Sequence, residues 1–333
     1  MTRRELLFQS AAVAALSQIV KADAPRSRMG IATTSYMTVR RFRDTYEFLE
    51  HCSALGAGGI QSQINGDLPK IRARAEQLNM FVEAIVGMPK PGDTAAFEKA
   101  VQNAKEVGAL CVRVNAGGRR YEDFSSRAEY QAFADRSLTS LKAVVPICEK
   151  YKVPFALENH KDWTLDQMVS ILKTYSSEYF GACLDFGNNI SLLDDPMEVV
   201  EQLAPYAVTT HAKDMGVEPY SEGFLLSEMP FGQGFLDLPR MFALVREKRP
   251  NTKFNLEMIT RDPLKVPCLT DRYWASFPDR SGLFLARTIR LVHTETRDKP
   301  LPRISQLAHD EQLRVEEENV RTCMTYAHAK LGC

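Results

Sequence analysis

Eight short apolar runs recur along the chain, and longer stretches of mixed polarity separate them. Within each run, apolar residues alternate with polar or small ones, as in a β-strand that has one apolar face. The stretches between the runs carry apolar residues three and four positions apart, which predicts amphipathic helices. The runs span residues 29–36, 58–64, 80–87, 110–117, 154–160, 181–188, 207–214 and 253–259, and helical stretches include 44–55, 68–78, 95–107 and 128–150.

Helix start signals agree with this alternation. Thr164 and Gln167 form a capping-box pair, Asp195 precedes a proline at the first helical position, and Asp237 is placed to cap the helix after it. Eight strand and helix alternations between residues 29 and 263 match the usual size of a (β/α)8 TIM barrel, about 250 residues. We therefore predict this α/β fold. A doubly wound open sheet is the alternative, but no glycine-rich phosphate fingerprint follows the first run.

Two connections are longer than a minimal barrel needs. Residues 215–236 follow the seventh run and residues 260–280 follow the eighth. Such βα loops commonly cover the catalytic face, although a packed surface excursion is the alternative. We expect a barrel domain over residues 25–295 and a C-terminal helical extension over residues 296–333, with an extra helix near 309–330. The sequence leaves open whether this helix covers the barrel floor or a partner subunit.

Four polar residues stand near the ends of the last four runs. Alternation places them on the face opposite the apolar side chains, and the carboxyl ends of barrel strands meet at one mouth. Three carboxylates and one imidazole make a mostly oxygen site for one divalent metal ion, with Mn²⁺ or Mg²⁺ favoured and Co²⁺ or Zn²⁺ allowed by the histidine. The four residues are Glu158, Asp185, His211 and Glu257.

Other polar residues are candidates for binding a substrate beside that metal. By the same alternation, the inward-facing candidates are Gln61, Gln63, Glu83, Arg113, Asn115 and His160. The alternative is polar filling of the barrel mouth. Arg261, Tyr273 and Trp274 lie in the segment after the eighth run, where substrate would be covered and selected.

Composition excludes several classes of partner. The 333 residues carry 42 basic and 42 acidic side chains, so nothing favours nucleic acid or an anionic membrane surface. The seven cysteines contain no C-x-x-C pair and suggest no disulfide framework.

The first 24 residues resemble a twin-arginine export signal. Arg3 and Arg4 precede an apolar stretch, residues 6–20, that is too short for a membrane span of about 20 residues, so no stable membrane anchor is expected. We predict a periplasmic or exported protein. The alternative is an amphipathic N-terminal helix of a cytoplasmic protein.

The motifs of the runs resemble the sugar isomerase and epimerase branch of the xylose-isomerase-like barrel superfamily, over about residues 29–291. They are L-E-N-H at 157–160, L-D-x-G-N at 184–188, H-x-K-D at 211–214, G-x-G-x-x-D at 232–237 and L-E at 256–257. The resemblance implies that the four residues named above bind one Mn²⁺-type ion, with His160, Asn188 and Lys213 near the substrate. The twin-arginine start and the R-D-P-L-x-V-P run at 261–267 are similar, more loosely, to exported members of this group in glycoside-degrading bacteria.

The predicted chemistry follows from a metal chelated by two adjacent sugar oxygens. Such an ion acidifies the neighbouring C–H and stabilises an enediolate, and a nearby carboxylate can move the proton. Glu158 and Glu257 are the acid/base candidates for a sugar isomerase or epimerase. If His160 protonates a departing group instead, the enzyme is a lyase that acts on 3-keto glycosides.

Two further alternatives remain in the sequence. A non-catalytic carbohydrate-binding barrel would need the same mouth. The endonuclease branch of the superfamily needs more histidines than the six present, of which only His160 and His211 end strands. A small sugar or keto-glycoside is the expected partner, and a homo-oligomer is compatible with the sequence.

Overall fold

The computed structural model describes residues 28–175, 177–277 and 280–333. The predicted export signal, residues 1–24, lies outside the described residues, and export stays a prediction. Among the described residues, no helix combines the length and the hydrophobicity needed to cross a bilayer.

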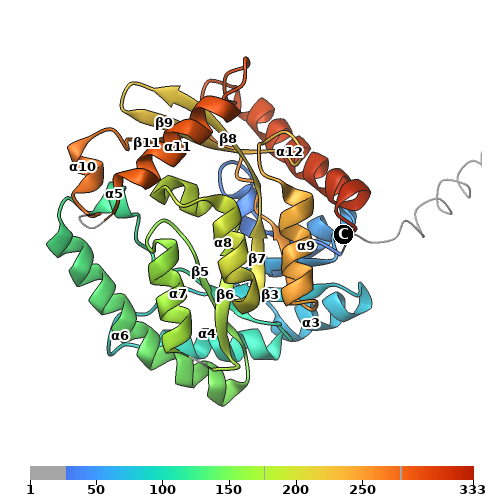
Figure 1. The fold of residues 1–333 in the computed structure, drawn as a ribbon. Coiled ribbons are helices and arrows are strands. Elements are labelled where there is room, and N and C mark those ends of the chain that lie inside the picture. Colours follow the sequence, from blue (N-terminus) through green and yellow to red (C-terminus); the bar gives the residue numbers. More distant parts are fainter. Residues whose placement is uncertain (1–27, 176, 278–279) are drawn as a thin grey trace, which may run out of the picture.

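Eight parallel strands close into a barrel, as predicted, in the order β1-β10-β7-β6-β5-β4-β3-β2 (Figure 1). Each strand is shorter than the apolar run that predicts it, because the run continues into the segment that follows the strand at the mouth, which is a loop, a 3-10 helix or, after β7, another strand. The strands are β1 (Gly30–Ala32), β2 (Gly59–Ser62), β3 (Phe81–Ile85), β4 (Val112–Val114), β5 (Phe155–Glu158), β6 (Phe180–Asp185), β7 (Ala207–Ala212) and β10 (Lys253–Leu256).

Helices surround the barrel, and those predicted to begin at Thr164, Asp195 and Asp237 do so. Asp44 accepts a hydrogen bond from the Glu47 N–H, and Asp195 and Asp237 cap their helices in the same way. The Gln167 side chain accepts from the Thr164 N–H, which completes the predicted capping box. These helices are α2 (Thr45–Ala54), α3 (Leu68–Gln77), α4 (Ala95–Glu106), α6 (Arg127–Tyr151), α7 (Leu165–Thr174), α8 (Pro196–Leu203) and α9 (Leu238–Lys248).

The two long connections contain regular structure and join each other. The first forms a hairpin of β8 (Asp214–Tyr220) and β9 (Gly223–Met229), and β11 (Leu264–Val266) from the second pairs with β9. The second connection also contains the short helix α10 (Asp271–Trp274), which packs on α5 (Arg120–Asp123). A small antiparallel sheet therefore stands at the barrel mouth where the sequence alone suggests loops.

The G-x-G-x-x-D motif closes the base of this hairpin. Both carboxylate oxygens of Asp214 accept backbone hydrogen bonds, from Gly232, Gly234 and Leu236. A side chain at position 234 would collide with that carboxylate, because an added Cβ would lie 2.0 Å from Asp214 Oδ1. Gly232 has a φ of +78°, which glycine adopts without strain.

The last helix covers the barrel wall rather than the floor. α12 (His309–Lys330) contacts β10 and the 3-10 helix η1 (Thr33–Tyr36). Glu316 in α12 accepts from the backbone N–H groups of Val39 and Arg40, and Cys333, after the helix, contacts Arg246 of α9. Figure 1 shows α12 beside α9. The preceding helix, α11 (Gly282–Glu295), packs on β8 at the mouth.

On β4, β5 and β6 the barrel interior changes from apolar to polar towards the mouth. Cys111, Ala156 and Cys183 form a small buried apolar cluster. Two residues further along β5 and β6, the inward positions are Glu158 and Asp185, both fully buried. The alternation predicts this change, because residues two apart on a strand share a face.

Candidate metal site

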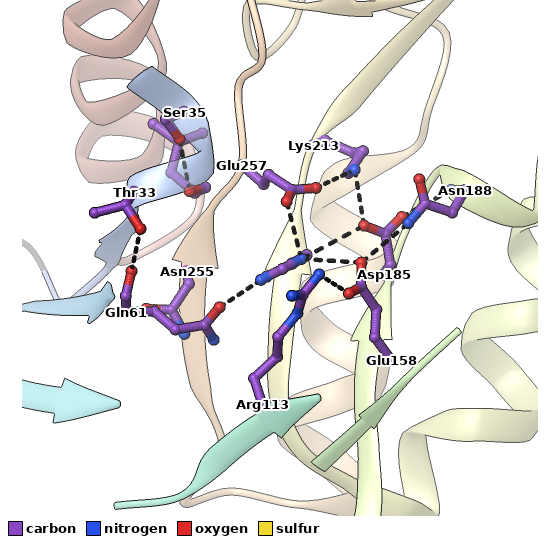
Figure 2. Close-up of polar contacts among 12 residues, drawn as sticks. Thr33, Ser35, Gln61, Arg113, Glu158, Asp185, Asn188, Lys213, Asn255 and Glu257 are labelled. Atoms are coloured by element: carbon purple, nitrogen blue, oxygen red, sulfur yellow. Dashed lines mark hydrogen bonds and ion pairs between the residues drawn. The ribbon is translucent and has the colours of Figure 1, made fainter. Parts of the chain in front are cut away.

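The structure brings the four predicted ligands together at the barrel mouth. Each offers one donor atom, and these atoms all lie within 4.8 Å of one another. Glu158 ends β5, Asp185 ends β6, His211 is in β7 and Glu257 directly follows β10. Figure 2 shows the side chains of Glu158, Asp185 and Glu257 converging from these strands. We call these four residues the polar quartet.

The imidazole of His211 is held so that one nitrogen faces the three carboxylates. Its Nε2 lies 2.5 Å from Gln61 Oε1, and the amide of Gln61 is fixed because its Nε2 donates to Glu83 Oε2 at 3.0 Å. His211 Nε2 therefore carries the proton. Nδ1 makes no hydrogen bond within the described part of the chain and lies 3.2 Å from Glu257 Oε1 and 3.3 Å from Glu158 Oε1.

This arrangement fits a cation. A buried nitrogen lone pair that faces carboxylate oxygens is repulsive unless a positive charge lies among them. Burial disfavours a charged imidazole, yet nearby Cys183 and Glu257 outweigh it and raise the pKa of His211 to about 9, so without a metal ion a proton on Nδ1 would supply this charge. The donor set of one imidazole nitrogen and three carboxylate oxygens suits Mn²⁺, Mg²⁺, Co²⁺ or Zn²⁺.

Two positively charged side chains form ion pairs with the carboxylates of the quartet (Figure 2). Arg113 pairs with Glu158 Oε2, and Lys213 bridges Glu257 Oε2 and Asp185 Oδ2, the latter at 2.8 Å. Three carboxylates still outnumber these two cations by one. Burial opposes the ionised form of Glu257, but His211 and Lys213 outweigh it and hold the pKa of Glu257 well below its ordinary value.

Backbone hydrogen bonds orient the Asp185 carboxylate towards the other three quartet residues. Its Oδ1 accepts from the N–H groups of Gly187 and Asn188, at 2.9 and 2.7 Å, and this leaves Oδ2 as the oxygen nearest His211. The Asn188 side chain donates to Glu158 Oε1 at 3.1 Å. Asn188 therefore contacts two quartet members, and its place beside the substrate stays a prediction.

Glu83 lies below the quartet rather than at the substrate face. It is fully buried, and its Oε2 accepts from Gln61, from Thr209 at 2.6 Å and from Asn255 at 2.8 Å. Burial raises the pKa of Glu83 despite these three donors. Strand alternation predicts that Glu83 binds substrate, but its contacts suit a residue that orients Gln61 and through it His211.

The contact between Gln61 and His211 gives a testable expectation. Replacing Gln61 with leucine is expected to weaken Mn²⁺ binding by about ten- to a hundredfold, because residues that orient a ligating histidine have effects of this size. Calorimetric titration with Mn²⁺ measures the change. The matched control is Gln63→Leu, since Gln63 is exposed two residues further on and is expected to leave the affinity unchanged. Unchanged affinity in Gln61→Leu would remove this role.

The remaining predicted residues differ in how near they come to the quartet. His160 Nδ1 lies 3.4 Å from the Gly118 carbonyl, and burial together with Arg113 lowers the pKa of His160 to about 3, so its imidazole is neutral at pH 7. Arg261 forms a bidentate ion pair with Glu228 of β9. Asn115 is half-buried just past β4 and has no hydrogen bond or ion pair with the quartet among the described residues.

Trp274 contacts residues of its own segment, after the eighth barrel strand. Its indole N–H donates to the Cys268 carbonyl at 2.9 Å, and its ring packs edge-on against Tyr273 and Phe277. Tyr273, the other aromatic candidate, is fully buried and donates to the Ser191 carbonyl. These contacts fit the alternative that this segment is a packed excursion.

A surface pocket opens beside the quartet over the first half of the barrel. Its lining includes Thr33, Gln63, Asn65 and Ile85, and also Arg113, which contacts Glu158. A small molecule at the quartet therefore has room on the side of β1 to β4. Lys161 and Glu228 lie near Arg261 on another side of the mouth. The sequence pattern did not identify either of them as a candidate site residue.

Comparisons with known proteins agree with this fold. The chain is similar to the solved structure of D-psicose 3-epimerase in the presence of D-fructose, at 13% identity with a TM-score of 0.59, covering 92% of this chain and 99% of that one. It is also similar to that of the IOLI protein with a bound zinc atom, at 16% identity with a TM-score of 0.55, covering 81% and 99%. At these identities the likeness shows the fold alone.

A curated relative is the 3-oxo-isoapionate decarboxylase of Pectobacterium atrosepticum, 29% identical over 126 residues, which are 37% of this chain and 46% of that protein. The chain spans about half the length of the curated relatives it matches. The family model described as xylose isomerase-like TIM barrel matches residues 49–274, roughly two thirds of the sequence. The chain therefore belongs to the xylose isomerase-like TIM barrel family.

Proposed function

We propose that this protein is a divalent-metal-dependent sugar isomerase or epimerase that works through an enediolate. The observation that carries the proposal is the polar quartet, whose four donor atoms lie within 4.8 Å of one another with His211 Nδ1 facing three carboxylates. Mn²⁺ is our first choice of ion, with Mg²⁺, Co²⁺ and Zn²⁺ as alternatives. The solved epimerase and zinc-bound structures of the same fold support this choice of class.

The ion would acidify the hydrogen on a carbon beside a sugar carbonyl. Glu158 and Glu257 each turn one oxygen towards the quartet and give the other to a cation, Arg113 or Lys213. Either carboxylate is thus placed to take that proton, and return to the next carbon or to the opposite face would give an isomer or an epimer. Arg113 and Lys213 keep the two carboxylates fixed while the proton moves.

Charge balance at the site also supports an anionic intermediate. With His211 neutral, as a metal ligand must be, the three carboxylates exceed Arg113 and Lys213 by one negative charge, and a divalent ion would turn this into one net positive charge. If Glu158 or Glu257 takes the proton, the enediolate carries one negative charge and the site beside it becomes more positive by one charge. Stabilising a charge that develops during a reaction is commonly the main way in which an enzyme lowers the activation barrier.

A lyase is the second candidate, and the curated relative favours it. Loss of CO2 from a 3-oxo acid breaks a carbon–carbon bond and leaves its electron pair on the adjacent carbonyl as an enolate, so the same positive site would serve. Elimination from a 3-keto glycoside would also begin with removal of a proton beside the carbonyl. The sequence suggests His160 as the proton donor of that reaction, but its imidazole is neutral at pH 7, so the carboxylate that took the proton would also have to return it to the departing group.

The test is exchange with solvent. The Mn²⁺-loaded protein, incubated in D2O with a panel of free ketoses and 3-keto glycosides, is expected to place deuterium on the carbon beside the carbonyl. A chelator is expected to abolish the exchange. Stereochemical change in the product would assign an isomerase or epimerase, and release of an aglycone would assign a lyase. A protein that binds these sugars without exchanging any hydrogen would be a carbohydrate-binding barrel, contrary to the proposal.

A further inference from the structure

Five charged residues gather at the mouth on the side of the β8–β9 hairpin. Glu228 is near enough to act electrostatically on both Lys161 and Lys213, and Glu257 acts in the same way on Arg261. The group therefore borders the polar quartet. Its members are Arg119, Glu122, Lys161, Glu228 and Arg261, and we call it the mouth cluster.

Two close ion pairs form within the mouth cluster, and they include every charged side chain of the cluster except Lys161. Arg261 binds Glu228 through two contacts of 3.1 and 2.5 Å, and Glu228 is 3% exposed. Arg119 binds Glu122 at 3.0 Å. Lys161 Nζ has only a longer contact, 3.7 Å from Glu122 Oε1, and makes no hydrogen bond in the part of the chain that the structure describes. Three cations thus face two carboxylates.

Lys161 is buried in spite of this. It is 3% exposed, whereas Glu122 and Arg119 are partly open to solvent, with side-chain exposures of 33% and 47%. Burial and the charge of Arg261 lower the pKa of Lys161 to about 8, in line with an ammonium group whose charge is not fully compensated. An ammonium group with three donors is costly to bury without hydrogen-bond acceptors.

We propose that Lys161 binds the carboxylate of an acidic sugar whose opposite end lies at the polar quartet. The proposal rests on the proposed function, because it places the reacting carbonyl at the quartet. A carboxylate carries one negative charge, which matches the one surplus positive charge of the mouth cluster. A phosphate ester carries nearly two, and the second would face Glu122 and Glu228 without a partner. The substrate class is therefore a keto sugar acid.

Binding of unreactive sugar derivatives tests this inference. The probes are D-glucitol, D-gluconate and D-glucitol 6-phosphate, titrated calorimetrically into the Mn²⁺-loaded protein. The wild type is expected to bind gluconate about tenfold or more tighter than glucitol, since a charge-assisted hydrogen bond has this strength. Lys161→Met is expected to remove the preference, and Lys161→Arg to keep most of it. Both variants should bind Mn²⁺ within about twofold of the wild type.

Several results would overturn the inference. One is equal binding of gluconate and glucitol by the wild type. Another is a gluconate preference that survives in Lys161→Met, which would place the carboxylate on the metal instead. Tighter binding of the phosphate ester than of gluconate would overturn the choice of a carboxylate. Failure of the proposed function would appear separately, as absent Mn²⁺ binding or absent hydrogen exchange in the wild type.

Discussion

Replacing Glu257 with glutamine is expected to lower kcat/KM by about a thousandfold or more and to weaken Mn²⁺ binding. Glutamine has the shape of glutamate, but one of its two oxygens becomes an NH2 group. If this group faces Lys213, two donors meet, and if it faces the centre of the quartet, a donor replaces the ligand oxygen 3.2 Å from His211 Nδ1. Loss of a general base alone costs about 10²- to 10⁴-fold, and loss of a ligand adds to it.

The two losses can be separated by measurement. Calorimetry gives the Mn²⁺ affinity, and hydrogen exchange at saturating Mn²⁺ gives the residual rate of proton removal. Glu50→Gln is a suitable control, because Glu50 pairs with Arg74 on the outside of the barrel and should leave both quantities unchanged. If Glu257→Gln keeps its metal and its exchange rate, Glu257 is neither a ligand nor a base, and the assignment of the site is wrong.

The residues of the quartet could be found from the sequence because two local rules suffice. Alternation assigns a face to each residue of a strand, and a closed parallel barrel brings all strand ends to one mouth. Neither rule requires knowing which side chains touch. The same reasoning fixed the direction of Glu83, but its depth depends on partners on β2, β7 and β10. Those contacts span up to 172 residues of sequence and leave no local pattern.

The mouth was harder to predict for a related reason. β9 and β11 pair although about 40 residues separate them, and β11 has only three residues, too few to stand out from a loop. Lys161 is also invisible to alternation, because it follows the end of β5, where the strand rule no longer applies. The charges around it come from Arg119 and Glu122 at the start of and within α5, from Glu228 of β9 and from Arg261 after β10. Such residues become visible only when separate loops are folded against each other.

Lys213→Met is expected to destabilise the metal-free protein by about 3–5 kcal/mol, the usual cost of removing one partner from a buried ion pair. Lys213 is 1% exposed and bridges Asp185 and Glu257, both buried, so its loss leaves two carboxylates facing each other near Glu158. Saturating Mn²⁺ should recover much of this loss, because the ion binds only the folded protein and supplies the missing charge. Mn²⁺ should therefore stabilise the variant more than it stabilises the wild type.

Denaturant unfolding with and without Mn²⁺ measures both quantities. Lys150→Met is the matched control, since Lys150 pairs with Glu98 at 2.8 Å but is 64% exposed, and exposed pairs contribute at most about 1 kcal/mol. Its stability should not respond to Mn²⁺ differently from that of the wild type. An equal gain from Mn²⁺ in Lys213→Met and the wild type would mean that Lys213 and the ion do not share the same carboxylates. In that case the positive charge that the quartet requires would have to lie elsewhere.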